Sequence, residues 1–282
     1  RRLHRETSAA VARMLIDTHL HWDAEEYDAD REDLLAAARA AGIGLFVVPG
    51  VVPGLFARQA EKCRDVPEAR LAWGVHPLYV HEVQRHAEAL AGAKPDGPGA
   101  CAAAMAQLES WIAAHPTVAI GEIGLDRFVA SPSLEAQRPW FEAQLRLAHT
   151  LGLPVILHVR RAVEDVLQSL AKHRVAGGIL HAFNGSFAQA ERALRLGFAL
   201  GFGGTMSYEG SRHVRRLAAE LPWEAIVLET DGPDIPPVWA QDRRTMPADL
   251  ARYAELLAEL RGCTVAEVIE RTGENARRVL RL

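Results

Sequence analysis

Short apolar stretches recur along the 282-residue chain, and each is followed by a polar or glycine-containing turn and a segment with helical periodicity. They are rich in Val, Ile, Leu and Phe and occupy residues 14–19, 43–48, 70–76, 118–122, 154–159, 178–182, 198–203 and 225–229. Apolar strands that alternate with helices are typical of a parallel sheet covered by helices. Eight such units in about 250 residues match a (β/α)8 barrel. We therefore expect an α/β fold with a single TIM-barrel domain; a doubly wound open sheet is the rival fold.

The positions of the polar residues favour the barrel. Several histidines and acidic residues stand at or just past the carboxyl end of an apolar stretch, namely His19, His76, Glu122, His158, His181 and Asp231. Barrel enzymes assemble their active sites from the residues at the carboxyl ends of their strands. The pattern therefore predicts one functional site, built from most of the strands, at that face.

Helical segments fill the intervals. Residues 33–41 and 134–150 show helical periodicity, and Ser133 is the expected N-cap of the second segment. Thr264 and Glu267 have the spacing of a capping box, which would begin a last helix running towards Leu280. The low-complexity segment 91–104 is expected to be a flexible surface loop between two helical pieces.

Composition excludes several classes of protein. The net charge is −4, with 49% hydrophobic and 24% charged residues. A protein that coats duplex DNA is usually more basic, so contact with a nucleic acid should be local, at a strand end or a short single strand. The three cysteines form no C-x-x-C pair, which indicates neither a disulfide framework nor a thiolate zinc site and favours a cytoplasmic location. No apolar run is long enough for a transmembrane helix, so we expect no contact with a membrane.

The first thirteen residues differ from the rest. Residues 1–13 begin with arginines but lack the apolar stretch of a secretory signal. Met14 stands directly before L-I-D-T-H-L-H, the start of the first motif. We expect residues 1–13 to be a leader outside the fold and residues 14–282 to form the barrel.

The strongest local signal is D-x-H-x-H at residues 17–21. Side chains alternate along a strand, so His19 and His21 would point the same way and could share one cation. An H-x-H pattern alone is more often a pair of ordinary half-buried histidines. Glu122 lies between glycines at the end of an apolar strand, where an unpaired carboxylate is unfavourable. Taken alone, it is a structural ion-pair partner.

Taken together, these residues favour a metal site over separate structural roles. The set of four histidines (His19, His21, His158 and His181) and two carboxylates (Glu122 and Asp231) comes from five strands. Imidazole nitrogen and carboxylate oxygen suit Zn²⁺, Mn²⁺ and Mg²⁺. The set provides enough ligands for two divalent cations, with one carboxylate as a bridge.

The ordered motifs of the chain resemble the TatD-type deoxyribonucleases, within the wider metal-dependent amidohydrolases. The motifs are D-x-H-x-H at 17–21, G-E-I-G-L-D at 121–126, L-P-V-I-x-H-x-R at 153–160, H-x-F-x-G at 181–185 and L-E-T-D at 228–231. Supporting matches are G-V-H-P at 74–77 and the helical pattern of Gln137, Phe141, Gln144, Leu145 and Ala148. Departures at Val159, Ala182 and Gly232 fall outside the presumed ligands.

The resemblance implies a role for each matched residue. His19, His21 and Asp231 would hold one cation, His158 and His181 the second, and Glu122 would bridge the two. Relatives that hydrolyse lactones, amides or phosphotriesters often carry a carboxylated lysine at the bridge, where this chain has Glu122.

These roles lead to a hypothesis about the reaction. A hydroxide activated by two cations would attack a phosphodiester, with Asp231 and Glu122 as catalytic residues. Arg160 and His76 are candidates for binding substrate. A salt bridge at the barrel rim is the alternative for Arg160, and contact with a further cation or a structural role is the alternative for His76. The residues expected to orient ligands are Asp17, Asp126, Asn184 and Glu229.

We therefore expect a metal-dependent deoxyribonuclease of the 3′–5′ exonuclease type. Its substrate would be single-stranded DNA or nucleic-acid ends, and no obligate protein partner is indicated. The alternative is hydrolysis of a small phosphoester, lactone or amide on the same scaffold, since one barrel hosts many chemistries. A non-catalytic metal-binding protein is the remote third possibility.

Overall fold

A parallel eight-stranded sheet forms the centre of the protein. The computed structural model describes residues 14–91, 98–240 and 243–282. The strands are β1 (Leu15–Asp17), β2 (Ile43–Val48), β3 (Ala69–Trp73), β4 (Ala119–Asp126), β5 (Val155–Arg160), β6 (Gly178–Leu180), β7 (Phe198–Phe202) and β8 (Ile226–Leu228). They pair in sequence order, so that each strand lies beside the next one along the chain.

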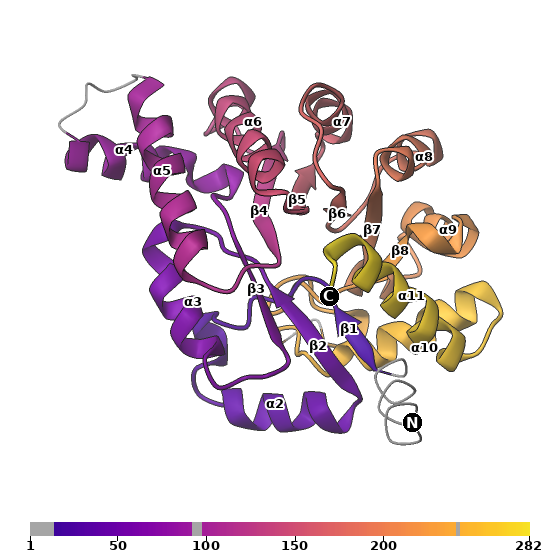
Figure 1. Cartoon of the computed structure of the whole chain (residues 1–282). Helices are drawn as coiled ribbons and strands as arrows, with labels where there is room; N and C mark the ends of the chain where they lie inside the picture. Colours follow the sequence, from indigo (N-terminus) through magenta and orange to yellow (C-terminus); the bar gives the residue numbers. More distant parts are fainter. Residues whose placement is uncertain (1–13, 92–97, 241–242) are drawn as a thin grey trace, which may run out of the picture.

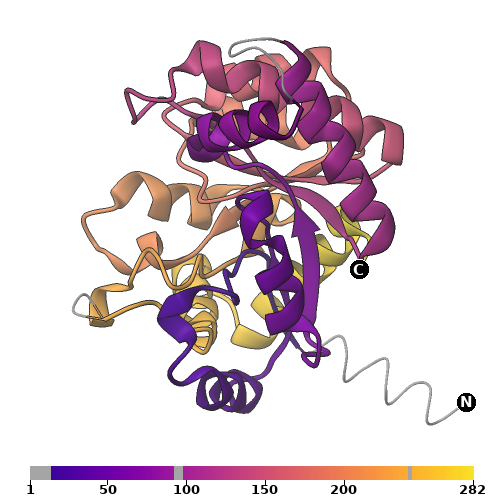
Figure 2. The ribbon, with the colours of Figure 1, turned by 90° about the vertical axis from the view of Figure 1, so that its left-hand side faces the viewer.

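Helices connect successive strands and surround the sheet (Figure 1). They are α2 (Arg31–Ala40), α3 (Phe56–Cys63), α4 (Val80–Ala91), α5 (Pro98–Ala114), α6 (Leu134–Leu151), α7 (Val163–Lys172), α8 (Phe187–Arg195), α9 (Arg212–Glu220), α10 (Asp249–Arg261) and α11 (Val265–Leu280). The short 3-10 helices are η1 (Glu25–Tyr27), η2 (Pro53–Leu55), η3 (Pro77–Tyr79), η4 (Gly204–Ser207), η5 (Trp223–Ala225) and η6 (Val238–Ala240). In the second view, α4 to α6 (magenta) gather over one flank and α2 (indigo) lies towards the opposite one (Figure 2).

The first and last strands meet and complete the barrel. The backbone N–H and the hydroxyl of Thr18, just past β1, both donate to the carbonyl of Leu228 at the end of β8, each at 3.0 Å. The architecture is therefore a (β/α)8 barrel, as predicted, and the open sheet is excluded.

Side-chain alternation divides the apolar residues into two cores. One residue of each strand enters an inner cluster made of Ile16, Val47, Ala72, Ala119, Ile156, Ile179, Ala199 and Val227. Their neighbours along the strands belong to the larger cluster between the strands and the surrounding helices. The last helix, α11, packs against β1, β6, β7 and β8 and adds Ala276, Val279 and Leu280 to the inner cluster. Polar side chains at the carboxyl ends of the strands are thereby left to form the site.

The predicted helix starts are confirmed. Ser133 Oγ accepts a hydrogen bond from the Ala136 N–H (3.3 Å) at the start of α6. Thr264 and Glu267 form a reciprocal capping box at the start of α11.

The flexible loop predicted at 91–104 is wrong in its second half, because α5 begins at Pro98. Proline suits the first turn of a helix and alanine is the strongest helix former, and Ala100 and Ala104 are buried. Residues 92–97 of that segment, like the predicted leader 1–13, lie outside the described residues. Among the described helices, none is both long and apolar enough to cross a membrane.

Gly124 allows β4 and β5 to approach each other. Its φ is +148°, and a Cβ at this position would lie 1.9 Å from the carbonyl oxygen of His158. We predict that Gly124→Ala lowers the free energy of unfolding by at least about 2 kcal/mol, because the methyl group forces the strands apart. Gly54→Ala is the control, since no atom lies within 4 Å of its added Cβ. Urea unfolding compares the two; equal stabilities would show that the strands separate here without cost.

Candidate metal centre

Glu122 points into the barrel because β4 contains a bulge. Between Gly121 and Ile123 the strand advances two residues while β5 advances only one, from Ile156 to Leu157. Ile123, like Ile120 on the other side of the bulge, packs in the outer core. An extra residue of this kind re-aims a side chain and is common beside active sites. Burial of the flanking isoleucines therefore leaves Glu122 on the inner face.

The two oxygens of the Glu122 carboxylate face different histidines. Oε2 is 3.1 Å from His19 Nε2 and 3.6 Å from His21 Nε2. Oε1 is 3.0 Å from His158 Nδ1 and 4.0 Å from His181 Nε2. Burial alone would raise the pKa of Glu122, but the surrounding rings, His19 foremost, lower it well below its usual range. The carboxylate is thus ionised and lies between two groups of imidazoles.

Asp231 faces three of the same histidines from the turn after β8. Its φ is +55°, in the left-handed region. Oδ1 is 3.4 Å from His21 Nε2 and 3.5 Å from His19 Nε2, whereas Oδ2 is 3.6 Å from His181 Nε2. The structure therefore brings the six predicted metal ligands into one cluster.

The reason given for pairing His19 with His21 is wrong, although the two side chains do converge. The expected strand 14–19 ends at Asp17, so both histidines lie in the following loop rather than in alternation on a strand. The backbone N–H of Leu20, between them, donates to the Val47 carbonyl of β2 (2.9 Å). This long-range hydrogen bond, and not strand periodicity, holds the loop over the barrel.

Two carboxylates determine which ring nitrogens face the centre. Asp126 Oδ2 is 2.8 Å from His158 Nε2, and Glu229 Oε1 is 3.0 Å from His181 Nδ1. A carboxylate that accepts the N–H of one ring nitrogen leaves the lone pair of the other nitrogen available to a cation. Asp126 and Glu229 thus make the contacts that they would need to orient metal ligands, as expected from the sequence.

Asp17 acts on the backbone rather than on a ring. Its Oδ1 accepts hydrogen bonds from the N–H groups of His19 (3.1 Å) and Thr230 (3.0 Å), and its Oδ2 accepts one from the Thr230 hydroxyl (2.6 Å). Burial raises the pKa of Asp17 to about 7. This fully buried carboxyl group therefore links the loops that carry His19 and Asp231.

Two buried glutamines of α6 hold the loops of the site. Gln137 exchanges hydrogen bonds with the backbone of Asp126, accepting at 2.7 Å and donating at 2.9 Å. Gln144 does the same with Val75, at 2.7 and 3.1 Å. They are seven positions apart in the sequence, so they lie on one face of the helix. The sequence pattern marked both glutamines, but only the structure shows what they bind.

The charges of the centre favour protonation of two of its rings, those of His181 and His21. Burial opposes a charge on His181, yet Glu229 and Asp231 raise its pKa to about 10. Burial likewise opposes a charge on His21, and Asp231 raises its pKa to about 9. A cation that binds here must therefore displace protons from imidazole rings.

The donor atoms fit divalent cations. Within the described residues, three groups of side chains bring ligand atoms within 4.8 Å of one another: His19, His21 and Asp231; His19, Glu122 and His181; and His76, Glu122 and His158. Nitrogen and carboxylate oxygen ligands of this kind suit Zn²⁺, Mn²⁺ and Mg²⁺.

His76 differs from the other histidines of the centre. Its Nδ1 accepts a hydrogen bond from the Leu78 N–H (3.1 Å), so the proton of the neutral ring must be on Nε2. That nitrogen lies 3.4 Å from Glu122 Oε1 and 3.2 Å from His158 Nδ1. The Leu78 amide thus directs the N–H of the neutral His76 ring toward the centre.

Two other predicted residues lie outside the cluster. The exposed side chain of Arg160 packs over the Phe128 ring, with 3.6 Å between Cζ and the ring centroid. Asn184 is exposed and, among the described residues, makes no hydrogen bond to a histidine of the centre. The sequence analysis did not select Phe128 as a site residue. Its position two residues after Asp126 could have indicated that it lies near the site.

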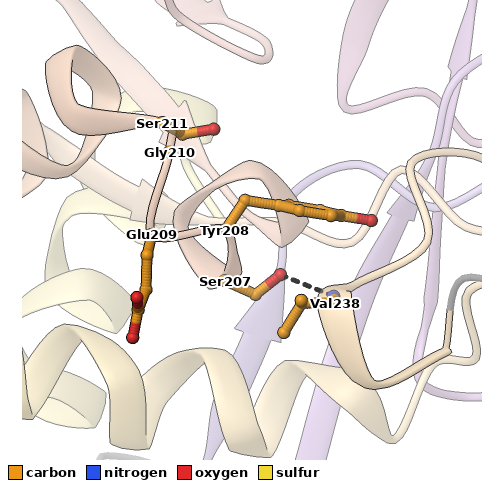
Figure 3. A pocket seen from close by; sticks show the side chains of 6 residues that line it. All are labelled: Ser207, Tyr208, Glu209, Gly210, Ser211 and Val238. Atoms are coloured by element: carbon orange, nitrogen blue, oxygen red, sulfur yellow. Dashed lines mark hydrogen bonds between the residues drawn. The ribbon is translucent and has the colours of Figure 1, made fainter.

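Cavities flank the centre on the β6–β8 side. A cavity of about 110 Å³ is lined by Asn184, Glu229 and Asp231, among others. A wider, more open pocket of about 500 Å³ follows along η4, where the Ser207 hydroxyl accepts a hydrogen bond from the Val238 N–H (2.8 Å; Figure 3). None of the predicted site residues lines the wider pocket.

The glutamine contacts generate a prediction about stability. Gln144→Leu should lower the free energy of unfolding by about 2 kcal/mol, because it leaves the buried N–H and carbonyl of Val75 unpaired. Hydrolysis should fall as well, since His76 follows directly. The control Gln168→Leu, at an exposed position of α7, should stay within about 0.5 kcal/mol of the unaltered chain. Urea unfolding measures the stability of each variant, and a rate assay measures its hydrolysis. Equal stabilities and rates of the two variants would contradict the proposed role of Gln144.

Metal loading generates a second prediction. Mn²⁺ at about 100 times its Kd should raise the free energy of unfolding by about 2.7 kcal/mol over chelated protein. At one fixed Mn²⁺ concentration the gain should be larger at pH 8 than at pH 6, because protons on His181, whose pKa is raised to about 10, compete with the cation and weaken its binding. Thermal unfolding with and without chelator measures it. If Mn²⁺, Zn²⁺ and Mg²⁺ all leave the thermal stability unchanged at both pH values, no cation binds at this cluster.

Known proteins share both the sequence and the structure of this chain. The profile of the TatD related DNase family matches residues 16–281. Over 249 residues the chain is 35% identical to the uncharacterized metal-dependent hydrolase YjjV of Escherichia coli K12, covering 87% of this chain and 90% of the relative. It is 30% identical over 271 residues to the human deoxyribonuclease TATDN3, covering 93% of each.

The crystal structure of the E. coli TatD homologue YJJV has the same fold. It matches with a TM-score of 0.83 at 33% identity, covering 96% of this chain and 99% of the other. The family profile spans nearly all of the chain, and the structural match extends over the whole barrel. This protein therefore belongs to the TatD-related DNase family and is a metal-dependent hydrolase built on a (β/α)8 barrel.

Proposed function

We propose that this chain is a deoxyribonuclease that removes nucleotides from the 3′ end of single-stranded DNA with the help of two divalent cations. The observation that carries the proposal is the position of the Glu122 carboxylate. One of its oxygens faces His19 and His21, and the other faces His158 and His181. A carboxylate placed in this way suits a bridge between two cations.

The remaining ligands follow from the same contacts. His19, His21 and Asp231 form the proposed first site, since both imidazoles approach Asp231 Oδ1 within 3.5 Å. His158 and His181 form the second. They lie on the Oε1 side of Glu122, and Asp126 and Glu229 orient their rings. The assay below compares Zn²⁺, Mn²⁺ and Mg²⁺ as the cation.

Divalent cations bound here would lower the pKa of a water molecule and neutralise the charge that develops on the phosphate. Asp231 is the proposed acceptor of the water's proton. Burial would raise the pKa of this carboxyl group, but His181 and His21 lower it, so the group is ionised at neutral pH. From the rim of the cluster it can pass the proton to the leaving 3′ oxygen.

His76 and Arg160 are the proposed contacts to the substrate. The Leu78 amide leaves the N–H of His76 directed toward the centre, where it can donate to a phosphate oxygen. Arg160 follows His158 by two residues and contributes an exposed positive charge at the end of β5. His76 would hold the phosphate by a hydrogen bond, and Arg160 would offset its negative charge, before the bond to the 3′ oxygen breaks.

DNA is the proposed substrate for two reasons. The human relative TATDN3 is named a deoxyribonuclease. The net charge of −4 fits local contact with a strand end better than binding along a duplex. A small phosphoester, lactone or amide is the alternative substrate, because one barrel supports many chemistries. The cytoplasmic location and the absence of an obligate protein partner also stay predictions.

Hydrolysis of labelled single-stranded DNA tests the proposal. Chelated protein reloaded with Mg²⁺, Mn²⁺ or Zn²⁺ should shorten the oligomer stepwise from its 3′ end. Asp231→Asn should reduce the rate at least about 100-fold, because the amide cannot accept the proton. Asp65→Asn, which makes the same change at an exposed position, should leave the rate unaltered.

Gel analysis of timed samples separates the possible results. Cleavage by the chelated protein, or undiminished cleavage by Asp231→Asn, would contradict the proposed mechanism. If no metal form cleaves DNA while one of them hydrolyses a lactone or amide panel, the alternative substrate class replaces DNA. A metal-loaded chain without activity on any of these substrates would point to a binding protein.

A further inference from the structure

Phe128 follows Asp126, which contacts the metal ligand proposed at His158, by two residues, and the proposed chemistry does not use its ring. The residue is 50% exposed, and its backbone N–H donates to Asp126 Oδ1 (2.8 Å). The other oxygen of that carboxylate is 2.8 Å from His158 Nε2. One carboxylate thus holds both a proposed metal ligand and the loop that carries Phe128. The backbone of Phe128 is therefore held beside the loop of the centre.

Two arginines from the end of β5 lie over this ring. The Cζ atoms of Arg160 and Arg161 are 3.6 Å and 4.9 Å from the ring centroid of Phe128. The Arg127 N–H donates to the Arg160 carbonyl (2.9 Å), which joins the two loops. A separation of 3.6 Å is a normal contact distance between carbon atoms. Phe128 thus supports the guanidinium of Arg160, whose side chain stays exposed.

The charges of these two arginines are available to a ligand. Within the part of the chain that the structure describes, neither Arg160 nor Arg161 pairs with a carboxylate, whereas Arg127 and Arg138 nearby both pair with Asp165 (2.7 and 2.9 Å). Arg161 also has a φ of +53°. A residue other than glycine in this region is strained, and such strain concentrates at functional sites.

We propose that Phe128, Arg160 and Arg161 form a nucleotide subsite next to the metal centre. A base of the single strand stacks on the Phe128–Arg160 pair, and the two guanidinium groups attract the flanking phosphates. The inference rests on the proposed function and specifies how that reaction holds its substrate. Aromatic rings and guanidinium planes stack on any base, so the subsite binds single strands without sequence preference. The faces of paired bases are covered in a duplex, which makes duplex DNA a poorer ligand.

Binding of single-stranded DNA in the presence of chelator tests the subsite without hydrolysis. One labelled oligomer carries natural nucleotides at its 3′ end, and a second carries abasic residues there. Phe128→Ala and Arg160→Gln should each weaken binding of the natural oligomer about tenfold. Phe128→Ala should leave binding of the abasic oligomer unchanged, because no base remains to stack. Arg160→Lys keeps the charge but lacks the planar group, so it should also weaken binding of the natural oligomer.

Matched controls come from the far end of α6. Leu151 is 36% exposed and Arg146 is exposed, and both precede the start of β5, at the opposite face of the barrel. Leu151→Ala and Arg146→Gln should bind both oligomers as the unaltered chain does. Equal thermal stability of Phe128→Ala and the unaltered chain shows that a loss of binding is not a loss of folding.

The outcomes separate the subsite from the proposed function. If the Mn²⁺-loaded chain cleaves DNA but Phe128→Ala binds the natural oligomer undiminished, the subsite is wrong and the proposed function stands. If base-dependent binding is lost in Phe128→Ala while no metal form of the unaltered chain cleaves DNA, the subsite stands and the proposed function fails. An unaltered chain that binds neither oligomer, or both equally well, overturns the subsite.

Discussion

A buried carboxylate among imidazole rings is the interaction on which the rest of this site depends. Glu122 is only 2% exposed, and burial of an unpaired carboxylate is strongly unfavourable. Its two oxygens are within 3.1 Å of His19 and His158, and the bulge in β4 keeps the side chain directed inward. The other groups of the centre take their places around this charge.

The scaffold supports that charge from outside the ligand set. Outer-core packing sets the direction of Glu122, and a buried Gln137 holds the backbone of Asp126, which orients His158. Asp17 links the end of β1 to the loop after β8. Each contact satisfies a polar group that burial would otherwise leave unpaired, so stability and the geometry of the site depend on the same hydrogen bonds.

Sequence reasoning succeeded where a physical signal is local. Apolar stretches predicted all eight strands, and the capping residues Ser133 and Thr264 predicted two helix starts. It failed where long-range contacts decide. The sequence of 98–104 suggested a flexible loop, but packing of Ala100 and Ala104 makes it a helix. Asn184 lines a cavity beside Asp231, and within the described residues it makes no hydrogen bond to a histidine of the centre.

The sequence by itself determined the fold and the identity of the clustered residues. Apolar strands that alternate with helices indicate a parallel sheet, and polar residues at the carboxyl ends of those strands favour a barrel, which places all these ends at one face. Only the tertiary structure decided how those residues are used. The Leu78 amide makes His76 a donor, the bulge turns Glu122 inward, and Phe128 supports Arg160. The bulge and the Phe128–Arg160 contact depend on pairing and packing between residues distant along the chain, which local sequence patterns do not encode.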